Sequence, residues 1–165
     1  MNERLTQILA PFFDLNLRKW KGLPHLKVEQ FQAAFGTPIS ISEEEVGCFP
    51  ARCSHFMFDS DCKFKVYDRQ GEVIMLCIMQ PKITKDMYSD LGEPDEILRP
   101  ELFRDEGYAH EELYCKNGIL ITRLQYRDKT RDDAIIRLRT FQPIDSVSEL
   151  NSELYFPWES REKWS

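Results

Sequence analysis

Residues 84–94 read Thr84-Lys-Asp-Met87-Tyr-Ser-Asp-Leu91-Gly92-Glu-Pro94, and residues 28–38 read Val28-Glu-Gln-Phe31-Gln-Ala-Ala-Phe35-Gly36-Thr-Pro38. When Gly36 is aligned with Gly92, a large apolar residue falls at the same two positions of each segment. Each segment is followed by a turn-rich stretch and by strand-like sequence that ends in Gln-Pro, at residues 80–81 and 142–143. The same order of features therefore occurs twice, which predicts pseudo-repeats over residues 26–81 and 82–143.

Both segments have the sequence of a short helix with a defined end. Glycine adopts the left-handed conformation that ends many helices, and a proline two residues later cannot continue the helix. Thr84 is a favourable N-cap residue for the second helix. Phe31 and Phe35, like Met87 and Leu91, are spaced i and i+4, so each helix presents one narrow apolar stripe. We expect this stripe to pack on a sheet.

Strand-like segments follow each helix. They are residues 54–59, 62–68 and 72–80 in the first unit and residues 112–116, 119–127 and 134–142 in the second. Asn117-Gly118 is typical of a type I′ hairpin turn. We predict an α+β fold with one antiparallel sheet of about six strands, built from two tandem units of a helix and three strands, with the helices on one face. A helix over residues 3–13 precedes the units in this prediction, and a helical tail over residues 146–165 follows them.

Alternation of apolar and polar residues assigns the side chains to two sheet faces. The apolar face is expected to hold Cys62, Phe64, Val66, Leu120, Thr122, Leu124, Tyr126, Ile136 and Leu138. The opposite face is expected to hold Lys63, Lys65, Tyr67, Arg123, Gln125, Arg137 and Arg139. A polar, partly open sheet face of this kind is a candidate binding surface.

The composition is that of an ordinary globular chain, in which 42% of the 165 residues are apolar and 30% are charged. This length favours a single domain over residues 1–165. The 28 acidic residues outnumber the 22 basic ones and give a net charge of −6, which argues against a nucleic-acid or anionic-membrane binder. The sequence contains neither an apolar stretch of about 18 residues nor a signal peptide at its start. We expect a cytoplasmic protein whose five cysteines are reduced.

The second segment carries a family resemblance. Its residues Leu91-Gly92-Glu93-Pro94-Asp95 are similar to the Leu-Gly-x-Pro-Asp turn of the β-lactamase-inhibitor-protein type of domain, and the order of elements over residues 26–143 is similar as well. The sequence shows neither the lipidated cysteine nor the paired disulfide pattern of the secreted members. The resemblance implies a binding surface on an exposed sheet face, without catalysis and without a cofactor. Small acidic cytoplasmic proteins of this type are often immunity proteins that neutralise a toxin.

Residues 93–112 hold eight acidic side chains and two arginines, a local net charge equal to that of the whole chain. Large apolar residues lie between the acids, as they do in many protein interfaces. The functional interpretation is an acidic loop that attracts a basic partner, and the alternative is a solvated loop that only aids solubility.

We expect the loop and the adjoining sheet face to form one partner-binding surface. Its residues are Asp95, Glu96, Glu101, Phe103, Asp105, Glu106, Tyr108, Tyr67, Arg123 and Arg137. The function predicted from this surface is a non-enzymatic, immunity-type inhibitor that occludes the active site of a toxin. If the toxin is a nuclease, the carboxylates take the place of phosphates in its basic groove.

Three other interpretations remain open. A zinc site would use four soft ligands that fall within fifteen residues, Cys48, Cys53, His55 and Cys62, although buried structural thiols explain them better. A thiol enzyme would pair Cys115 with His110, or Cys53 with His55. A structural homodimer would use the aromatic residues near the C-terminus as its anchor. We expect a protein partner and no metal, cofactor or nucleic acid, while the partner's identity and the oligomeric state stay undetermined.

Overall fold

The computed structural model describes residues 2–103, 107–150 and 153–155. Its helical segments are α1 (Asn2–Phe13), η1 (Leu17–Lys19), α2 (Val28–Phe35), α3 (Lys85–Tyr88), η2 (Ser89–Leu91) and η3 (Val147–Glu149). Its strands are β1 (Ser40–Val46), β2 (Phe49–Met57), β3 (Lys63–Arg69), β4 (Glu72–Met79), β5 (Glu96–Phe103), β6 (Gly107–Tyr114), β7 (Ile119–Tyr126) and β8 (Ala134–Thr140). Within these ranges, no helix has the length and apolar character required to cross a membrane.

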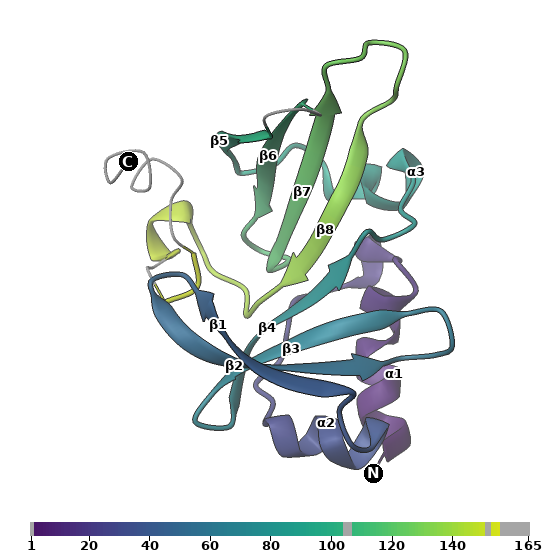
Figure 1. The fold of residues 1–165 in the computed structure, drawn as a ribbon, viewed down its shortest axis with the longest axis vertical. Coiled ribbons are helices and arrows are strands. Elements are labelled where there is room, and N and C mark those ends of the chain that lie inside the picture. The colour runs from purple at the N-terminus through teal and green to yellow at the C-terminus, as the bar shows by residue number, and fades with distance from the viewer. Residues whose placement is uncertain (1, 104–106, 151–152, 156–165) are drawn as a thin grey trace.

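The strands of the described residues form one antiparallel sheet of eight, in the order β1-β2-β3-β4-β8-β7-β6-β5. β1 to β4 form one meander and β5 to β8 form another, and the two meanders join where β4 pairs with β8 (Figure 1). The α+β class and the antiparallel sheet are confirmed. The prediction of about six strands in three-stranded units is wrong, because β1 and β5 add one strand at each edge of the sheet.

The two additional strands lack the pattern that identifies a strand in the sequence. β1 reads Ser-Ile-Ser-Glu-Glu-Glu-Val, and most of its side chains are exposed because it lies at the edge of the sheet. β5 contains Pro100, whose ring nitrogen cannot donate a hydrogen bond, and its pairing with β6 shifts between Leu98 and Glu101. An edge strand tolerates both features, whereas a central strand does not.

The two Gly-x-Pro segments end in the same backbone geometry. Gly36 caps α2 with a φ of 80° and a ψ of −161°. Gly92 follows η2 with a φ of 74° and a ψ of −154°. The helices before them differ, since α2 has eight residues whereas the second segment is divided into the four-residue α3 and the three-residue η2.

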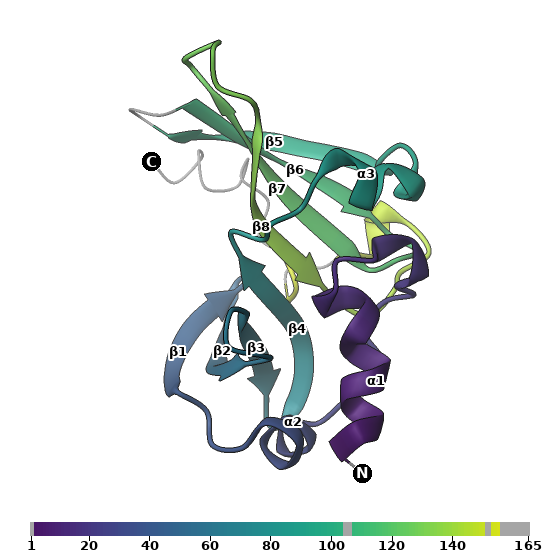
Figure 2. The same cartoon turned by 90° about the vertical axis from the view of Figure 1, so that its right-hand side faces the viewer.

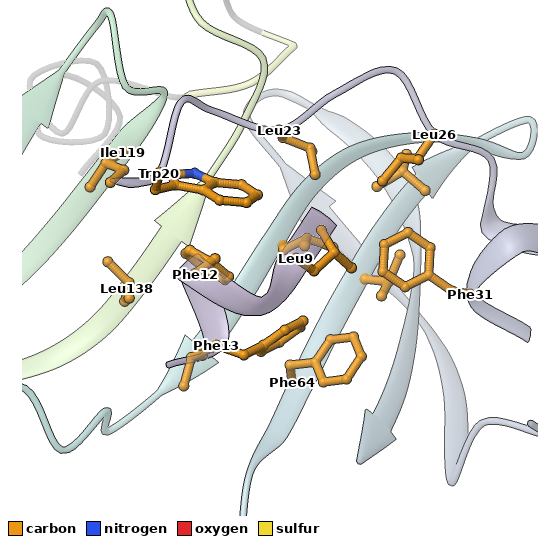
Figure 3. Close-up of a cluster of buried hydrophobic side chains, with 14 of the residues drawn as sticks. Leu9, Phe12, Phe13, Trp20, Leu23, Leu26, Phe31, Phe64, Ile119 and Leu138 are labelled. Carbon is orange, nitrogen blue, oxygen red and sulfur yellow. The ribbon is translucent and has the colours of Figure 1, made fainter. Parts of the chain in front are cut away.

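The main hydrophobic core lies between the helices and one face of the sheet, which we call the inner face (Figure 2). Leu9 of α1 is fully buried, and Phe13 of α1 has its ring centroid 4.6 Å from that of Phe64 in β3 (Figure 3). Trp20, which follows η1, donates a hydrogen bond from Nε1 to Thr140 Oγ1 at 2.8 Å. The core therefore includes side chains from both meanders.

The observed register corrects the predicted assignment of faces. Phe64 of β3 and Leu138 of β8 lie on the inner face, and Leu138 pairs with Ile121 of β7. Consequently Leu120, Thr122 and Leu124 point to the opposite face, which we call the outer face. Arg123 points to the inner face, not to the face that it was predicted to share with Tyr67 and Arg137. The start of β7 is apolar on both faces, so its alternation could not set the register.

The chain after β8 crosses the outer face of the second meander. Its apolar side chains pack against a cluster of Leu113, Cys115, Leu120 and Phe141. In η3 the Glu149 carboxylate accepts a hydrogen bond from the backbone N–H of Ser146 at 3.1 Å. Of the predicted helical tail, residues 151–152 and 156–165 lie outside the described residues.

One arginine connects this segment to the first meander. Arg69 donates hydrogen bonds to the carbonyl oxygens of Glu153, at 2.6 Å, and of Val46, at 2.5 Å. The C-terminal segment thus lies beside the turn between β1 and β2 (Figure 1).

Candidate functional site

A polar cavity of about 270 Å³ lies on the outer face of the sheet. Its walls come from both meanders and from Leu154 and Tyr155 of the C-terminal segment. The outer-face charged side chains that line it are Glu44, Lys65, Glu111, Arg137 and Arg139. Neighbouring strands bring them together because alternate residues of a strand point to the same face.

Glu111 of β6 is held by two arginines from β8. Its Oε1 forms ion pairs with Arg139 and, at 3.6 Å, with Arg137, and it accepts a hydrogen bond from Thr122 Oγ1 at 3.2 Å. Burial raises the pKa of Glu111, but Arg139, the Tyr155 hydroxyl and Arg137 outweigh burial, and the net pKa is lowered. Glu111 is therefore ionised, and its charge is neutralised inside the protein.

A second polar group surrounds Glu44 of β1. Lys65 Nζ lies 3.3 Å from Glu44 Oε1. The Cys53 sulfur, a ring nitrogen of His55 and a carboxylate oxygen of Glu44 all lie within 4.8 Å of one another. Burial and the neighbouring Glu44 carboxylate raise the pKa of the Cys53 thiol to about 12, so the thiol keeps its proton at neutral pH.

The structure separates the four residues of the predicted zinc set. Cys53 and His55 share the outer face because β2 pairs with β3 without a bulge. Cys48 is exposed in the turn between β1 and β2, and Cys62 packs against the inner-face core. Glu44, which was not part of the predicted set, lies beside Cys53 and His55 instead. The sequence signal for its position is the hairpin turn at Gly47-Cys48, because that turn pairs β1 with β2.

The thiol pair of Cys115 and His110 is not assembled. Cys115 belongs to the outer-face cluster, and its backbone N–H donates to Asp95 Oδ2 at 2.7 Å. His110 lies on the inner face, where its Nε2 is 3.2 Å from Glu112 Oε1. Because the two side chains are on opposite faces, the imidazole cannot take the thiol proton.

Arg123, which was predicted to bind the partner, is part of a half-buried network on the inner face. Its Nε donates to Glu112 Oε1 at 2.8 Å, and its Nη2 donates to the Tyr88 hydroxyl at 2.6 Å. The Tyr114 hydroxyl donates to Glu112 Oε2 at 3.4 Å. Burial raises the pKa of Glu112, but hydrogen bonds to His110 and Arg123 outweigh burial and lower the pKa to about 2. Through the hydrogen bond from Arg123 to Tyr88, the network connects α3 to the sheet.

Tyr67 and Arg137 share the outer face, as predicted, but they line the cavity instead of an open surface. Tyr67 is 9% exposed, and burial raises the pKa of its hydroxyl. The Arg137 side chain faces Glu111. Tyr67 therefore presents little of its surface to a macromolecular partner.

The predicted acidic loop is largely an edge hairpin formed by β5 and β6. Glu93 and Glu96 are exposed beside this edge. Ile97 and Tyr108, which both point to the inner-face side, are 60% and 48% exposed. We call these four residues the acidic edge.

The other predicted loop residues have different positions. Asp95 is exposed, and its Oδ2 is the acceptor for the Cys115 backbone. Glu101 and Phe103 belong to β5, but their side chains lie outside the described part of the structure, as do all atoms of Asp105 and Glu106.

The predicted partner-binding residues whose side chains the structure describes thus occupy separate environments. Glu96 and Tyr108 belong to the acidic edge and Asp95 lies beside it, Tyr67 and Arg137 line the outer-face cavity, and Arg123 belongs to the inner-face network. Comparisons of the chain with protein-family models, with curated proteins and with solved structures found no match.

Proposed function

We propose that the protein is a cytoplasmic, non-enzymatic binding protein that recognises a basic surface of a protein partner through the acidic edge. The observation that carries this proposal is the exposure of Ile97 next to the exposed carboxylates of Glu93 and Glu96, with Tyr108 exposed further along the same hairpin, opposite Leu102. Apolar and aromatic side chains supply most of the affinity of a protein interface. The carboxylates at the start of β5 favour partners of opposite charge.

The position of this surface at the end of the sheet also supports the proposal. β5 is the last strand in the order of the described sheet, so one side of its backbone is not paired within that sheet. An extended segment of a partner pairs with such an edge, and the alternating side chains supply specificity. Glu96 and Ile97 point to opposite sides of β5, so a partner at the edge contacts both.

Internal ion pairs determine which acids of residues 93–112 attract a partner. Glu111 and Glu112 are neutralised by arginines of β8 and β7. Glu93 and Glu96 remain directed to solvent. Their field acts over about 10 Å at 0.1 M salt, so it raises the association rate mainly at low ionic strength.

The most concrete form of this function is an immunity-type inhibitor in which the acidic edge covers the basic active site of a toxin. A nuclease is the clearest target, because its groove binds phosphates with arginines and lysines. Carboxylates form charge-assisted hydrogen bonds with the same side chains. Inhibition would then be both steric and electrostatic.

Charge reversal at the acidic edge tests the proposal. The variant E93R/E96R is compared with the control D61R/E72R, which reverses two exposed carboxylates of the first meander and changes the net charge equally. Wild type and both variants capture partners from the source cells, and association with the purified partner is then measured at two salt concentrations.

We expect E93R/E96R alone to lose the partner and to associate about tenfold more slowly at low salt. The control should retain both the partner and the rate. Equal recovery of the same partner by both variants would remove the acidic edge as the binding surface.

A further inference from the structure

We propose that Glu44, Cys53 and His55 form a binding site for Zn²⁺ on the outer face, beside the polar cavity. These residues come from β1 and β2 in the first meander, whereas the acidic edge lies on β5 and β6. The site is therefore independent of the proposed partner surface. It also differs from the predicted zinc set, because Cys48 and Cys62 do not take part.

The three ligand atoms are already near the arrangement found around zinc. They lie within 4.8 Å of one another. Bonds of about 2.0–2.3 Å in a tetrahedral site place the ligand atoms roughly 3.5 Å apart, so small side-chain rotations are sufficient. Two paired strands hold the backbones, with Cys53 opposite Ser42 and Glu44 opposite Ala51.

The two carboxylate oxygens of Glu44 have different surroundings. Oε1 lies 3.3 Å from Lys65 Nζ. Oε2 is buried, and within the described residues it has no hydrogen-bond partner. Besides Lys65, the carboxylate interacts with the Cys53 thiol, which is a weak donor. A cation in place of the thiol proton is a stronger partner for the buried oxygen. Lys65 orients the carboxylate through the other oxygen, as neighbouring groups commonly orient metal ligands.

The donor set indicates zinc. Thiolate, imidazole and carboxylate are all zinc ligands, whereas calcium and magnesium bind oxygen alone. On binding, the Cys53 S–H bond breaks, the proton passes to solvent, and the sulfur donates its electron pair to the metal. The thiolate and the carboxylate then bring two negative charges to the ion, and Lys65 stays in contact with the other carboxylate oxygen.

The surroundings provide the remaining parts of a tetrahedral site. The Tyr67 hydroxyl hydrogen-bonds to the Cys53 sulfur. Glu44 and Tyr67 both line the adjoining cavity of about 270 Å³, which has room for a water molecule as the fourth ligand. Zinc would tie the edge strand β1 to β2 and stabilise the folded chain.

Cobalt substitution tests the site, because Co²⁺ bound to a thiolate gives a charge-transfer absorption band. The full chain, without a histidine tag and freed of metal by chelator, is titrated with Co²⁺ and then with Zn²⁺. We expect a band that saturates at one equivalent and is displaced by Zn²⁺, together with a zinc-dependent rise in the melting temperature.

Two variants test the ligands Cys53 and Glu44, and two more serve as controls. C53S should abolish the band, and E44Q should weaken Co²⁺ binding by about tenfold or more. C48S and C62S, which change cysteines outside the cluster, should retain the band and the affinity of the wild type. If C53S fails to fold, the Co²⁺ affinity of E44Q and the bands of the two control variants still test the proposed ligand set.

Two results would overturn the proposal. One is a folded wild type that gives no thiolate–cobalt band and no zinc-dependent stabilisation. The other is a band lost in C48S or C62S, or an E44Q affinity equal to that of the wild type, since either result excludes the stated ligands.

Discussion

Replacing Glu112 with glutamine measures how strongly the inner-face network stabilises the protein. The Glu112 side chain is 10% exposed, and its contacts lower the pKa from the ordinary 4.5 to about 2. Since each pKa unit is worth about 1.36 kcal/mol, the ionised carboxylate contributes about 3 kcal/mol near neutral pH. E112Q also leaves the Arg123 guanidinium without its counterion, and breaking a buried pair costs about 3–5 kcal/mol. We therefore expect E112Q to lower the free energy of unfolding by about 3 kcal/mol at pH 7.

The size of this loss should depend on pH. The pKa of Glu112 is lower in the folded chain than in the unfolded chain, so its contribution is complete above about pH 4.5 and disappears as the pH falls toward 2. In urea titrations, the gap between wild type and E112Q should narrow from about 3 kcal/mol at pH 7 to about 1 kcal/mol at pH 3. E72Q, at an exposed carboxylate 3.9 Å from Lys27, is the control and should cost less than about 0.5 kcal/mol.

Two outcomes would refute this reasoning. The first is an E112Q loss below about 1 kcal/mol at pH 7, which would mean that the network is not a net source of stability. The second is a gap that stays constant between pH 7 and pH 3, which would mean that the pKa of Glu112 is not lowered by folding.

Three further measurements test the core, one turn and the cysteines. Phe64 is 1% exposed, so F64A should lower the free energy of unfolding by about 3–5 kcal/mol in urea titrations, and a loss below about 1 kcal/mol would contradict its burial. Gly118 has a φ of 55°, and a Cβ there would lie 2.0 Å from the carbonyl oxygen of Phe141. At Gly36, φ is 80° but no atom lies within 4 Å of such a Cβ. G118A should therefore lower the melting temperature more than G36A. Equal effects of the two glycine substitutions would argue against this close approach. Cys48 is exposed and should react with Ellman's reagent in the native protein before the three buried cysteines, and a slow Cys48 would contradict its position in the turn.

Features encoded by neighbouring residues were predictable. The glycine at the end of each Gly-x-Pro helix and the central strands β3, β4, β7 and β8 follow from local signals, because helix caps and period-two alternation depend on adjacent side chains. The edge strands β1 and β5 were not predicted. These strands tolerate acidic residues and a proline because each lies at an edge of the sheet. The sequence alone does not show which strands are at the edges, since that depends on the strand order.

The site required information about pairing between strands. The shared face of Cys53 and His55 follows from their spacing on one strand, but the addition of Glu44 depends on the pairing of β1 with β2. The face of Arg123 depends on the pairing of β7 with β8, which puts Ile121 opposite the inner-face Leu138. A shift of one residue moves a side chain to the opposite face, so an isolated strand pattern could not determine the position of Arg123.

Hydrogen exchange of the captured complex is the most direct test of the proposed partner surface. The measurement compares amide protection in the free protein and in the complex for two sheet edges, β5 with Glu96 and Ile97, and β1 with Ile41. We expect partner binding to slow exchange in β5 and at Tyr108 of β6 and to leave β1 unchanged. Slower exchange confined to β1, or the same rates in β5 with and without partner, would contradict the assignment of the acidic edge as the binding surface.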